Sequence, residues 1–379
     1  MKRICYGSTH HFVDCMAEGF KNLGWEVEIF DLEKEGFEAL ERLSGRTYDA
    51  VVDFNSILPK AVTDEDIPFL DTIDAPFYNY ILDHPLYHHE SLCVELKDYH
   101  VICLDDNHAR YIRKCYRHIK SCHVLPLAGE AAGTKLPAIN ERPIDLLFTG
   151  TYTSPDMALD LLAKTSAGRE DEARRILDLQ LQNPDRPLEE IVEEAVVNSG
   201  VDPGTIDFPL LMHFCFPIDT YMAARSRCRA VAEIARSGVP LTLVGFGWDS
   251  FKEIEGLKNV TVLGPAGFSK QFKFMSESKM VLNVMPGFKS GIHDRVFSTM
   301  LNGALSLTDE TAGLLAEFTP WEEVVTYSAE TPEELPDKIR KLLSEPERLA
   351  GIAQKGFKKS NKNHTWQELC RKLQDVITK

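Results

Sequence analysis

Three successive polar residues, His293, Asp294 and Arg295, are the strongest candidates for chemistry in this sequence. A guanidinium can bind two phosphate oxygens at once, and an imidazole can donate a hydrogen bond to a phosphate or a hydroxyl group. The triplet follows a loop with Gly287 and Gly291, where the backbone can approach a ligand closely. It also stands at the start of a predicted helix, whose free N–H groups and positive dipole end favour an anion. These residue types at this spacing predict a phosphate-binding site.

The elements around the triplet form a strand-loop-helix-strand unit. A short apolar run over residues 280–285 predicts a buried strand, and residues 293–302 have the period of a helix that stops at Gly303. A second apolar run then leads to Asp309. The unit would hold the loop and the helix start at the carboxyl end of the first strand.

Strands alternate with helical segments along the whole chain, which indicates an α/β fold with parallel, doubly wound sheets. In the first half, apolar runs predict strands over residues 3–6, 25–30, 48–54, 76–82, 100–104 and 123–127. Ligands bind beyond the carboxyl ends of the strands in such sheets. Polar residues at those ends are candidates for a site, although a loop cap is the simpler interpretation of each one alone: His10, His11, Asn55, Asp83, His84 and Asp105.

The second half repeats this organisation. Its first predicted strands, over 144–152, 239–245 and 260–265, carry at their carboxyl ends Gly150 and Tyr152, Gly245, and Gly264 with Pro265. Residues 156–237 are mostly helical by period and too long for one crossover helix, which indicates a helical insertion. The last helix of the insertion carries Arg225 and Arg229, either of which could reach a diphosphate.

The length of 379 residues exceeds one ordinary core and indicates two domains. A loop rich in Gly, Ala and Pro gives the expected boundary. We expect two Rossmann-type domains that face a cleft: an N-terminal domain over 1–140, a C-terminal domain over 141–345 that includes the insertion, and closing helices over 346–379.

Composition excludes several classes of function. The formal net charge of −16 disfavours nucleic acid as a partner. The nine cysteines are scattered and form no C-x-x-C pair, so we expect reduced thiols and no zinc site. His84 and His88 are separated by Pro85, which interrupts the helix that would align them, and no metal site is predicted. No run of about 18 apolar residues predicts a membrane span, and no signal-peptide pattern is evident, so a cytoplasmic location is expected.

The stretch Gly287-Phe-Lys-Ser-Gly-Ile-His-Asp-Arg-Val-Phe-Ser-Thr-Met-Leu-Asn-Gly-Ala304 resembles the donor-binding segment of glycosyltransferases of the GT-B fold. It is most similar to the bacterial group-1-type enzymes that include CgeB-like proteins. This resemblance implies that the C-terminal half binds a nucleotide-sugar donor, expected to be a UDP-sugar, and that the N-terminal half binds an acceptor. The acceptor would be a protein or a glycan, as in surface glycosylation, and the donor is a co-substrate with no other cofactor implied.

The resemblance also assigns residues to the donor. Arg295 and the backbone near His293 would hold the diphosphate, Gly264 and Pro265 would lie at the base, and the loop from Gly287 to Gly291 would lie near the sugar. Many retaining relatives have a glutamate where this chain has Ser298, to bind the ribose, and another where it has Ser290. A serine can form only a neutral, weaker hydrogen bond with a ribose hydroxyl.

The mechanism expected for such an enzyme is metal-independent, because helix dipoles and cationic side chains can neutralise the leaving diphosphate. A general base is needed only if the enzyme inverts the sugar, and His11 and Asp83 are the candidates. A metal-dependent transferase would need an Asp-x-Asp after an apolar strand, whereas Asp64-Glu65-Asp66 lies in a polar loop. A sugar-nucleotide epimerase on the same fold and a catalytically silent binding or scaffold protein remain open alternatives. The sequence does not indicate an oligomeric state.

Overall fold

The computed structural model describes residues 2–7, 11–30, 32–285 and 287–379. Within these ranges no helix is both long and apolar enough to cross a membrane. The chain divides into two compact units. Unit 1 contains residues 1–127, 207–213 and 366–379, and unit 2 contains 128–206 and 214–365.

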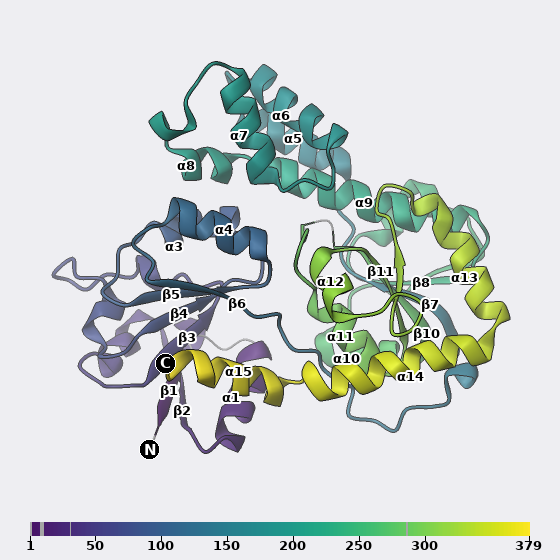
Figure 1. Cartoon of the computed structure of the whole chain (residues 1–379), viewed down its shortest axis with the longest axis horizontal. Coiled ribbons are helices and arrows are strands. Elements are labelled where there is room, and N and C mark those ends of the chain that lie inside the picture. The colour runs from purple at the N-terminus through teal and green to yellow at the C-terminus, as the bar shows by residue number, and fades with distance from the viewer. Residues whose placement is uncertain (1, 8–10, 31, 286) are drawn as a thin grey trace. The chain divides into compact units, whose positions relative to one another are not determined.

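Unit 1 is built on a parallel six-stranded sheet with the order β2-β1-β3-β4-β5-β6 (Figure 1). The strands are short and largely buried, in keeping with their apolar sequences. They are β1 (Arg3–Tyr6), β2 (Glu26–Ile29), β3 (Ala50–Phe54), β4 (Phe77–Tyr80), β5 (Tyr99–Cys103) and β6 (Ser121–Val124). The helices are α1 (His11–Asn22), α2 (Leu32–Glu35), α3 (His89–Leu92), α4 (Asp106–Cys115), α15 (Trp366–Ile377) and most of α8 (Phe208–Phe214).

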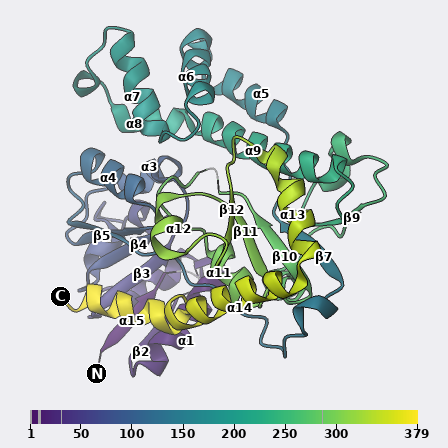
Figure 2. The same cartoon turned by 45° about the vertical axis from the view of Figure 1, so that its right-hand side comes forward.

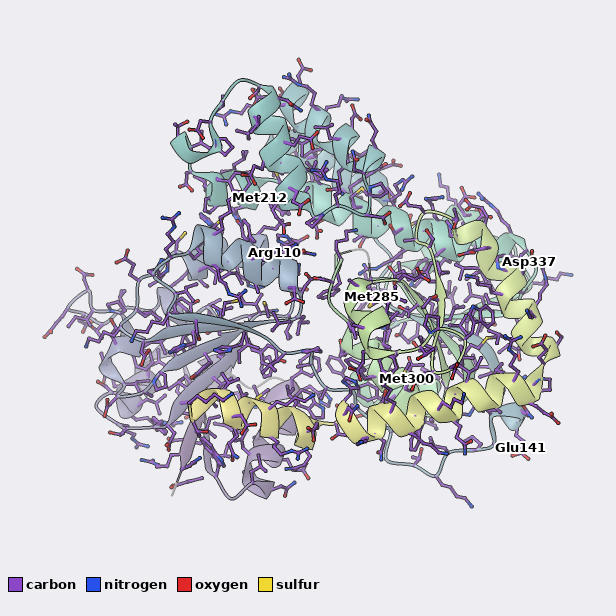
Figure 3. All side chains as sticks on the ribbon, viewed as in Figure 1. Arg110, Glu141, Met212, Met285, Met300 and Asp337 are labelled. Carbon is purple, nitrogen blue, oxygen red and sulfur yellow. The ribbon has the colours of Figure 1, made fainter. Side chains whose placement is uncertain are left out.

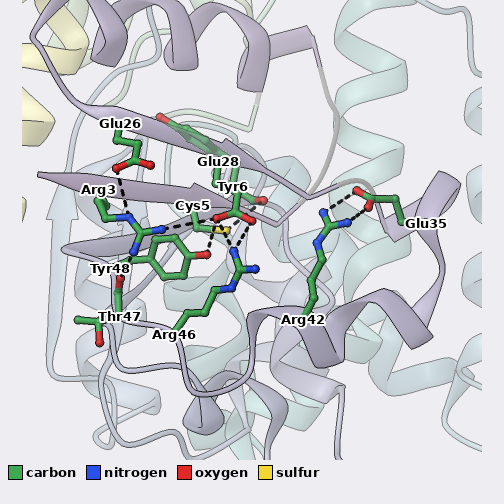
Figure 4. Close-up of polar contacts among 10 residues, drawn as sticks. All are labelled: Arg3, Cys5, Tyr6, Glu26, Glu28, Glu35, Arg42, Arg46, Thr47 and Tyr48. Carbon is green, nitrogen blue, oxygen red and sulfur yellow. Dashed lines mark hydrogen bonds and ion pairs between the residues drawn. The ribbon is translucent and has the colours of Figure 1, made fainter. Parts of the chain in front are cut away.

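Charged side chains cover the β2 edge of this sheet (Figure 4). Glu28 on β2 accepts hydrogen bonds from Arg46 Nη1 at 3.0 Å and from the Tyr48 hydroxyl at 2.6 Å, and Arg3 Nε lies 3.4 Å from Glu26. Burial, helped by the bond to Glu28, raises the pKa of Tyr48 to about 12, so this hydroxyl stays a donor at ordinary pH. Charges on an edge strand discourage pairing with a strand of another chain.

Unit 2 is built on a second parallel six-stranded sheet, with the order β12-β11-β10-β7-β8-β9. Its strands are β7 (Ile144–Thr149), β8 (Leu241–Val244), β9 (Val260–Val262), β10 (Ser278–Asn283), β11 (Leu305–Asp309) and β12 (Val325–Tyr327). Its helices are α5 (Pro155–Thr165), α6 (Glu170–Gln182), α7 (Leu188–Asn198), α9 (Phe216–Arg236), α10 (Phe268–Ser276), α11 (Asp294–Leu301), α12 (Ala312–Glu317), α13 (Leu335–Ser344) and α14 (Pro346–Asn363). The expected insertion, over 156–237, contains α5 to α9, of which most of α8 lies in unit 1. Helices α5, α6 and α7 group beyond α9 and away from the strands of this sheet in both views (Figures 1 and 2).

Helices cover both faces of the second sheet because successive strand residues point to opposite sides. Leu146 and Phe148 of β7 pack in a cluster with α9, α13 and α14, whereas Leu147 packs on the other face with α10. A third apolar cluster under α11 and α12 includes Met285 and Met300, which are labelled in Figure 3. The core therefore fixes α11 against the ends of the central strands.

The division into units differs in three places from the one expected from the sequence. Residues 207–213, expected within the insertion of the C-terminal domain, belong to unit 1. The boundary lies between Leu127 and Ala128, before the loop and not within it. The last helix, α15, belongs to unit 1, whereas α14 belongs to unit 2. The reason is packing of α15 on α1: a Cβ on Gly19 would lie 2.4 Å from Cys370 Sγ, and Trp25 Nε1 donates to Gln374 Oε1 at 2.8 Å. The two closing helices are thus parts of different cores.

A buried arginine joins the start of unit 2 to its central elements. Arg142 is 4% exposed, and its Nη1 donates to the carbonyl of Ser278 at 2.9 Å and to that of Asn302, at the C-terminal end of α11, at 3.1 Å. A cation is favourable at that end of a helix. Burial lowers the pKa of Arg142 to about 10, and this group remains charged at neutral pH.

We expect Arg142→Leu to lower the free energy of unfolding by about 2–4 kcal/mol, because two buried carbonyl groups lose their charged donor. Urea unfolding followed by circular dichroism measures this change. The matched control is Arg174→Leu on α6, an exposed arginine, which should change stability by no more than about 0.5 kcal/mol. Equal effects of the two substitutions would contradict a structural role for Arg142.

Candidate active site

The predicted phosphate site lies where the strand order of unit 2 reverses. β7 and β10 are neighbours, but the chain continues from β7 toward β8 and β9 and from β10 toward β11 and β12. The loops that follow β7 and β10 therefore leave toward opposite sides of the sheet, which opens a ligand position at their carboxyl ends. The loop after β10 carries the triplet at 293–295, as the sequence predicted.

His293 is the N-cap of α11, and its Nδ1 accepts a hydrogen bond from the backbone N–H of Arg295 at 3.1 Å. The same Nδ1 lies 2.7 Å from Asp294 Oδ1. Burial would raise the pKa of the Asp294 carboxyl, but the charge of His293 and its hydrogen bond, and the charge of Arg295, lower it. Nδ1 can accept from Arg295 only in the neutral ring, whereas a protonated ring pairs with Asp294.

Arg295 points back to the end of β10, where its Nη1 donates to Asn283 Oδ1 at 2.8 Å. The pKa of Arg295 is lowered to about 10, mainly by burial; Arg227 on α9 also lowers it, whereas Asp294 and Asp309 partly offset the shift. Arg227 is thus close enough for its charge to act on Arg295. Two like charges held near a helix N-terminus repel each other, and an anion placed between them removes that repulsion.

Arg227 was missed by the sequence reasoning, which named its neighbours on α9. Arg229 instead donates to the carbonyl of Glu330 at 3.0 Å and to Glu333 Oε1 at 3.1 Å, which is a structural contact. The role proposed for Arg225 toward a diphosphate stays a prediction. Alternate arginines on a helix point in different directions, and only the packing of α9 on the sheet decides which one turns to the site.

A network of hydrogen bonds at the end of β11 also supports the site. Asp309 is 4% exposed, and both of its carboxylate oxygens accept from the backbone N–H of Met285 at 2.8 Å. Asn283 Nδ2 donates to Thr308 Oγ1 at 3.0 Å, so the residue that holds Arg295 is itself held. Burial raises the pKa of Asp309 to about 6. In the sequence, the position of Asp309 directly at the end of an apolar strand is the feature that could have identified it as a site residue.

The loop between β10 and α11 is fastened at three points. Thr311 Oγ1 donates to the carbonyl of Gly291 at 2.6 Å, and a Cβ on Gly313 would lie 2.2 Å from the carbonyl oxygen of Ser290. Lys289 Nζ donates to the carbonyl of Pro184 in the loop between α6 and α7 at 2.7 Å. The loop is therefore tied both to α12 and to the insertion. A Cβ on Gly287 would meet nothing within 4 Å, so packing does not require this glycine.

Gly150 and Gly245 bring the ends of β7 and β8 into close contact. A Cβ on Gly245 would lie 2.0 Å from the carbonyl oxygen of Gly150, which also accepts from Trp248 Nε1 at 2.7 Å. The ring of Tyr152 packs against Trp248 and Phe251. Packing alone therefore accounts for these residues, and their contact with a donor stays a prediction.

The position predicted for the nucleotide base lies next to this contact. Gly264 has a positive φ of 70°, which favours glycine, and its carbonyl accepts from the backbone N–H of Gly245 at 2.9 Å. Two apolar side chains flank these glycines and are exposed: Phe246, at 65%, and Leu263, at 44%. Gly264 and Pro265 thus follow the end of β9 beside apolar groups that could cover a base.

Ser298 has a packing role that the sequence did not suggest. It is 1% exposed, and its Oγ accepts from the backbone N–H of Glu130 at 3.0 Å. Gly129 lies against Phe297, the residue before Ser298: a Cβ on Gly129 would be 2.6 Å from the backbone carbon of Phe297. A glutamate at position 298 would displace this segment. A contact of Ser298 with a ribose stays a prediction.

In unit 1, local contacts distinguish the polar residues at the strand ends. Asp105 caps α4 by accepting from Asn107 N, and His84 Nδ1 accepts from Leu86 N, so both have capping roles. Asp83 is exposed and accepts from Asn55 Nδ2 at 3.0 Å. Asn55 follows β3 and Asp83 follows β4, two neighbouring strands.

His11 begins α1, with Nε2 4.0 Å from Cys15 Sγ. His10 lies outside the described residues. The base role of His11 and Asp83 stays a prediction.

Residues 225–375 match the model of a family described as glycosyl transferase-like. This range contains Arg227, Asn283, Arg295 and Asp309. Comparison of the sequence with curated proteins finds no significant match.

Among solved structures, similarity extends over the whole chain. Sucrose-phosphate synthase from Thermosynechococcus elongatus superposes with a TM-score of 0.59 at 12% identity, covering 99% of this chain and 98% of that one. HepE from Anabaena in complex with UDP-glucose gives 0.56 at 11% identity, with both chains fully covered. An alpha-glucosyltransferase in complex with UDP-glucose and DNA containing an abasic site gives 0.57 at 12% identity, covering 100% and 99%. At these identities the likeness concerns the fold.

The chain has the GT-B fold, and the family match over residues 225–375 supports a transferase enzyme. The enzyme class and the fold expected from the sequence are thereby confirmed, and the CgeB-like subgroup stays a prediction. The matched range begins within α9 and covers most of the second sheet.

We expect Gly245→Ala to destabilise the glycosyltransferase by about 2 kcal/mol or more, because the added Cβ would collide with the carbonyl oxygen of Gly150. Thermal unfolding measures the effect. Gly267→Ala is the control, since a Cβ there meets nothing within 4 Å and the φ of −67° suits any residue. A wild-type midpoint for Gly245→Ala would show that the two strand ends are not in close contact.

Proposed function

We propose that this glycosyltransferase moves a sugar from a UDP-sugar to a hydroxyl group of a protein or glycan acceptor, in the cytoplasm and without a metal ion. The observation that carries the proposal is the guanidinium of Arg295, in the first turn of α11 and bonded to Asn283, on which the charge of Arg227 also acts. This cationic position lies at the strand-order reversal, inside the range that matches the family. It suits the diphosphate of the donor.

In the proposed reaction the bond between the sugar C1 and the β-phosphate oxygen breaks, and a bond from C1 to the acceptor oxygen forms. The diphosphate gains negative charge as it leaves, and Arg295, Arg227 and the positive dipole end of α11 stabilise that charge. The acceptor hydroxyl loses its proton. If the sugar configuration is inverted, the proton goes to a base, for which His11 and Asp83 of unit 1 are proposed.

UDP is the proposed nucleotide because HepE and the alpha-glucosyltransferase are both described in complex with UDP-glucose. In this chain the base would lie at Gly264 and Pro265, where the exposed Phe246 and Leu263 offer apolar surface. The sugar would lie near the loop from Gly287 to Gly291, whose geometry the bonds of Thr311 and Lys289 hold.

The site assignment predicts that Arg295→Ala weakens UDP binding about 10- to 150-fold, the equivalent of about 1.5–3 kcal/mol for one charge-assisted pair. Titration calorimetry with UDP measures the affinity. Arg236→Ala is the control: this exposed arginine lies on α9 and forms ion pairs with Glu233 and Glu253, so UDP affinity should not change. Full affinity in the Arg295 variant would refute the assignment.

Turnover with a panel of UDP-sugars and acceptors tests the function itself. Transfer to an acceptor supports the proposal. Epimerisation or hydrolysis of the donor without an acceptor would indicate an epimerase, and binding of UDP without any turnover would indicate a silent binding protein. A folded protein that binds no nucleoside diphosphate would overturn the transferase proposal.

The base assignment predicts that Asp83→Asn lowers kcat about 100-fold or more, the usual contribution of a general base, while UDP affinity stays unchanged. The amide keeps the shape and can still contact Asn55. Asp64→Asn, in a loop of the same unit, is the matched control and should keep the wild-type kcat. Unchanged turnover in the Asp83 variant would leave His11 as the candidate or indicate a retaining enzyme.

A further inference from the structure

The helix that presents the diphosphate site also anchors the segment by which the chain enters unit 2. The chain passes from unit 1 to unit 2 between Leu127 and Ala128, here the first passage, and finally returns between Thr365 and Trp366, here the second passage; residues 207–213 also lie in unit 1. Residues 129–132, the strap, run along α11 just after the first passage. His364 stands just before the second passage. The contacts of both with α11 lie entirely within unit 2.

Polar contacts fasten the strap to the C-terminal half of α11. Glu130 N donates to Ser298 Oγ at 3.0 Å, and Ala132 N donates to Asn302 Oδ1 at 2.8 Å. Asn302 Nδ2 in turn donates to the carbonyl of Glu130 at 2.9 Å. Ser298 and Asn302 are 1% and 0% exposed. They are one helical turn apart, so they present one polar stripe to the strap.

The second passage meets the same helix. The ring of His364 stacks on that of Phe297, with centroids 4.0 Å apart and planes 7° apart, and His364 Nε2 lies 3.1 Å from Glu317 Oε1. Gly129 N donates to the carbonyl of His364 at 2.9 Å, which joins the strap directly to the second passage. Both passages are therefore held at one place on α11.

These contacts on α11 lie close to the diphosphate site, which is at the start of the same helix. Arg295 and Phe297 are separated by one residue, and the last turn of α11 is fixed by Arg142 at the carbonyl of Asn302. The residues of α11 from 296 to 301 are all buried, so α11 moves as one rigid unit. A small displacement of its first turn therefore also displaces the residues that pack on the rest of the helix.

We propose that Ser298 and Asn302 are positioning residues that couple occupancy of the diphosphate site to the strap. The proposal rests on the proposed function, because the diphosphate of the donor is the effector. A phosphate bound by Arg295 and the α11 N-terminus draws the helix into one position, and the strap and His364 follow because they are bonded to that helix. Serine at position 298 is then the residue that permits the strap to lie on α11, where a glutamate would displace it.

Hydrogen exchange of the full-length enzyme, with and without saturating UDP, tests the coupling. We expect UDP to slow exchange of the amides at 129–132 about 5-fold or more, while α7 is unchanged. In Ser298→Ala this slowing at Glu130 should be lost. Because coupling is reciprocal, the same variant should bind UDP about 5-fold more weakly in calorimetry.

The matched control is Thr299→Val, the next residue on α11. The Thr299 hydroxyl is buried, and it has no hydrogen-bond partner in the part of the chain that the structure describes. This variant should keep both the UDP affinity and the slowing of strap exchange. A purely structural role of Ser298 would change strap exchange equally with and without UDP.

The outcomes separate the inference from the function on which it rests. UDP binding with no change of exchange at 129–132 in the wild-type enzyme overturns the coupling and leaves the proposed function intact. Failure of the wild-type enzyme to bind UDP overturns both. Slowed strap exchange that persists in Ser298→Ala excludes Ser298 as the positioning residue.

Discussion

The constraint on which the second unit depends is the need to keep a guanidinium charged in a half-buried position. Burial alone disfavours the cation, as the lowered pKa of Arg295 indicates. Its Nη1 is bonded to Asn283 at the end of β10, and the carboxylates of Asp294 and Asp309 offset the burial. Each compensating group stands at the end of a central strand or in the first turn of α11. The ends of the central strands and the first turn of α11 are therefore placed so that they stabilise the positive charge of Arg295.

The same arrangement explains why the site is ready for an anion. Arg227 on α9 adds a second positive charge that acts on Arg295 and contributes to lowering its pKa. A diphosphate brings negative charge to this cationic position, at the positive dipole end of α11. The loop that leads into the helix is fastened to α12 and to the insertion through Gly291 and Lys289. Preorganised donors of this kind need little rearrangement when charge develops on a leaving group.

The helical insertion and the departures from the related sequences have physical consequences in this chain. The insertion contributes a carbonyl, that of Pro184, to hold the donor loop, so it is part of the support of the site. Ser298, at the position where the resemblance implies a glutamate in many relatives, accepts a hydrogen bond from the backbone N–H of Glu130. At identities of 11–12% to the structures that share the fold, such local exchanges are expected, since a fold tolerates many contact sets with the same strand order.

The sequence by itself determined the class of fold, the order of strands and helices, and the central position of residues 293–295. Hydrophobic periodicity and the residues that start or end a helix are local properties of the sequence. An apolar run, two glycines and a helix start can be recognised without knowing which elements pack beside them. Tertiary structure alone decided that Arg229 bonds to Glu330 and Glu333 and that the charge of Arg227 acts on Arg295, because the direction of a helical side chain depends on how the helix packs. It also decided that the last two helices belong to different units and that Ser298 faces the strap. These are contacts between residues far apart in sequence, and no local pattern encodes them.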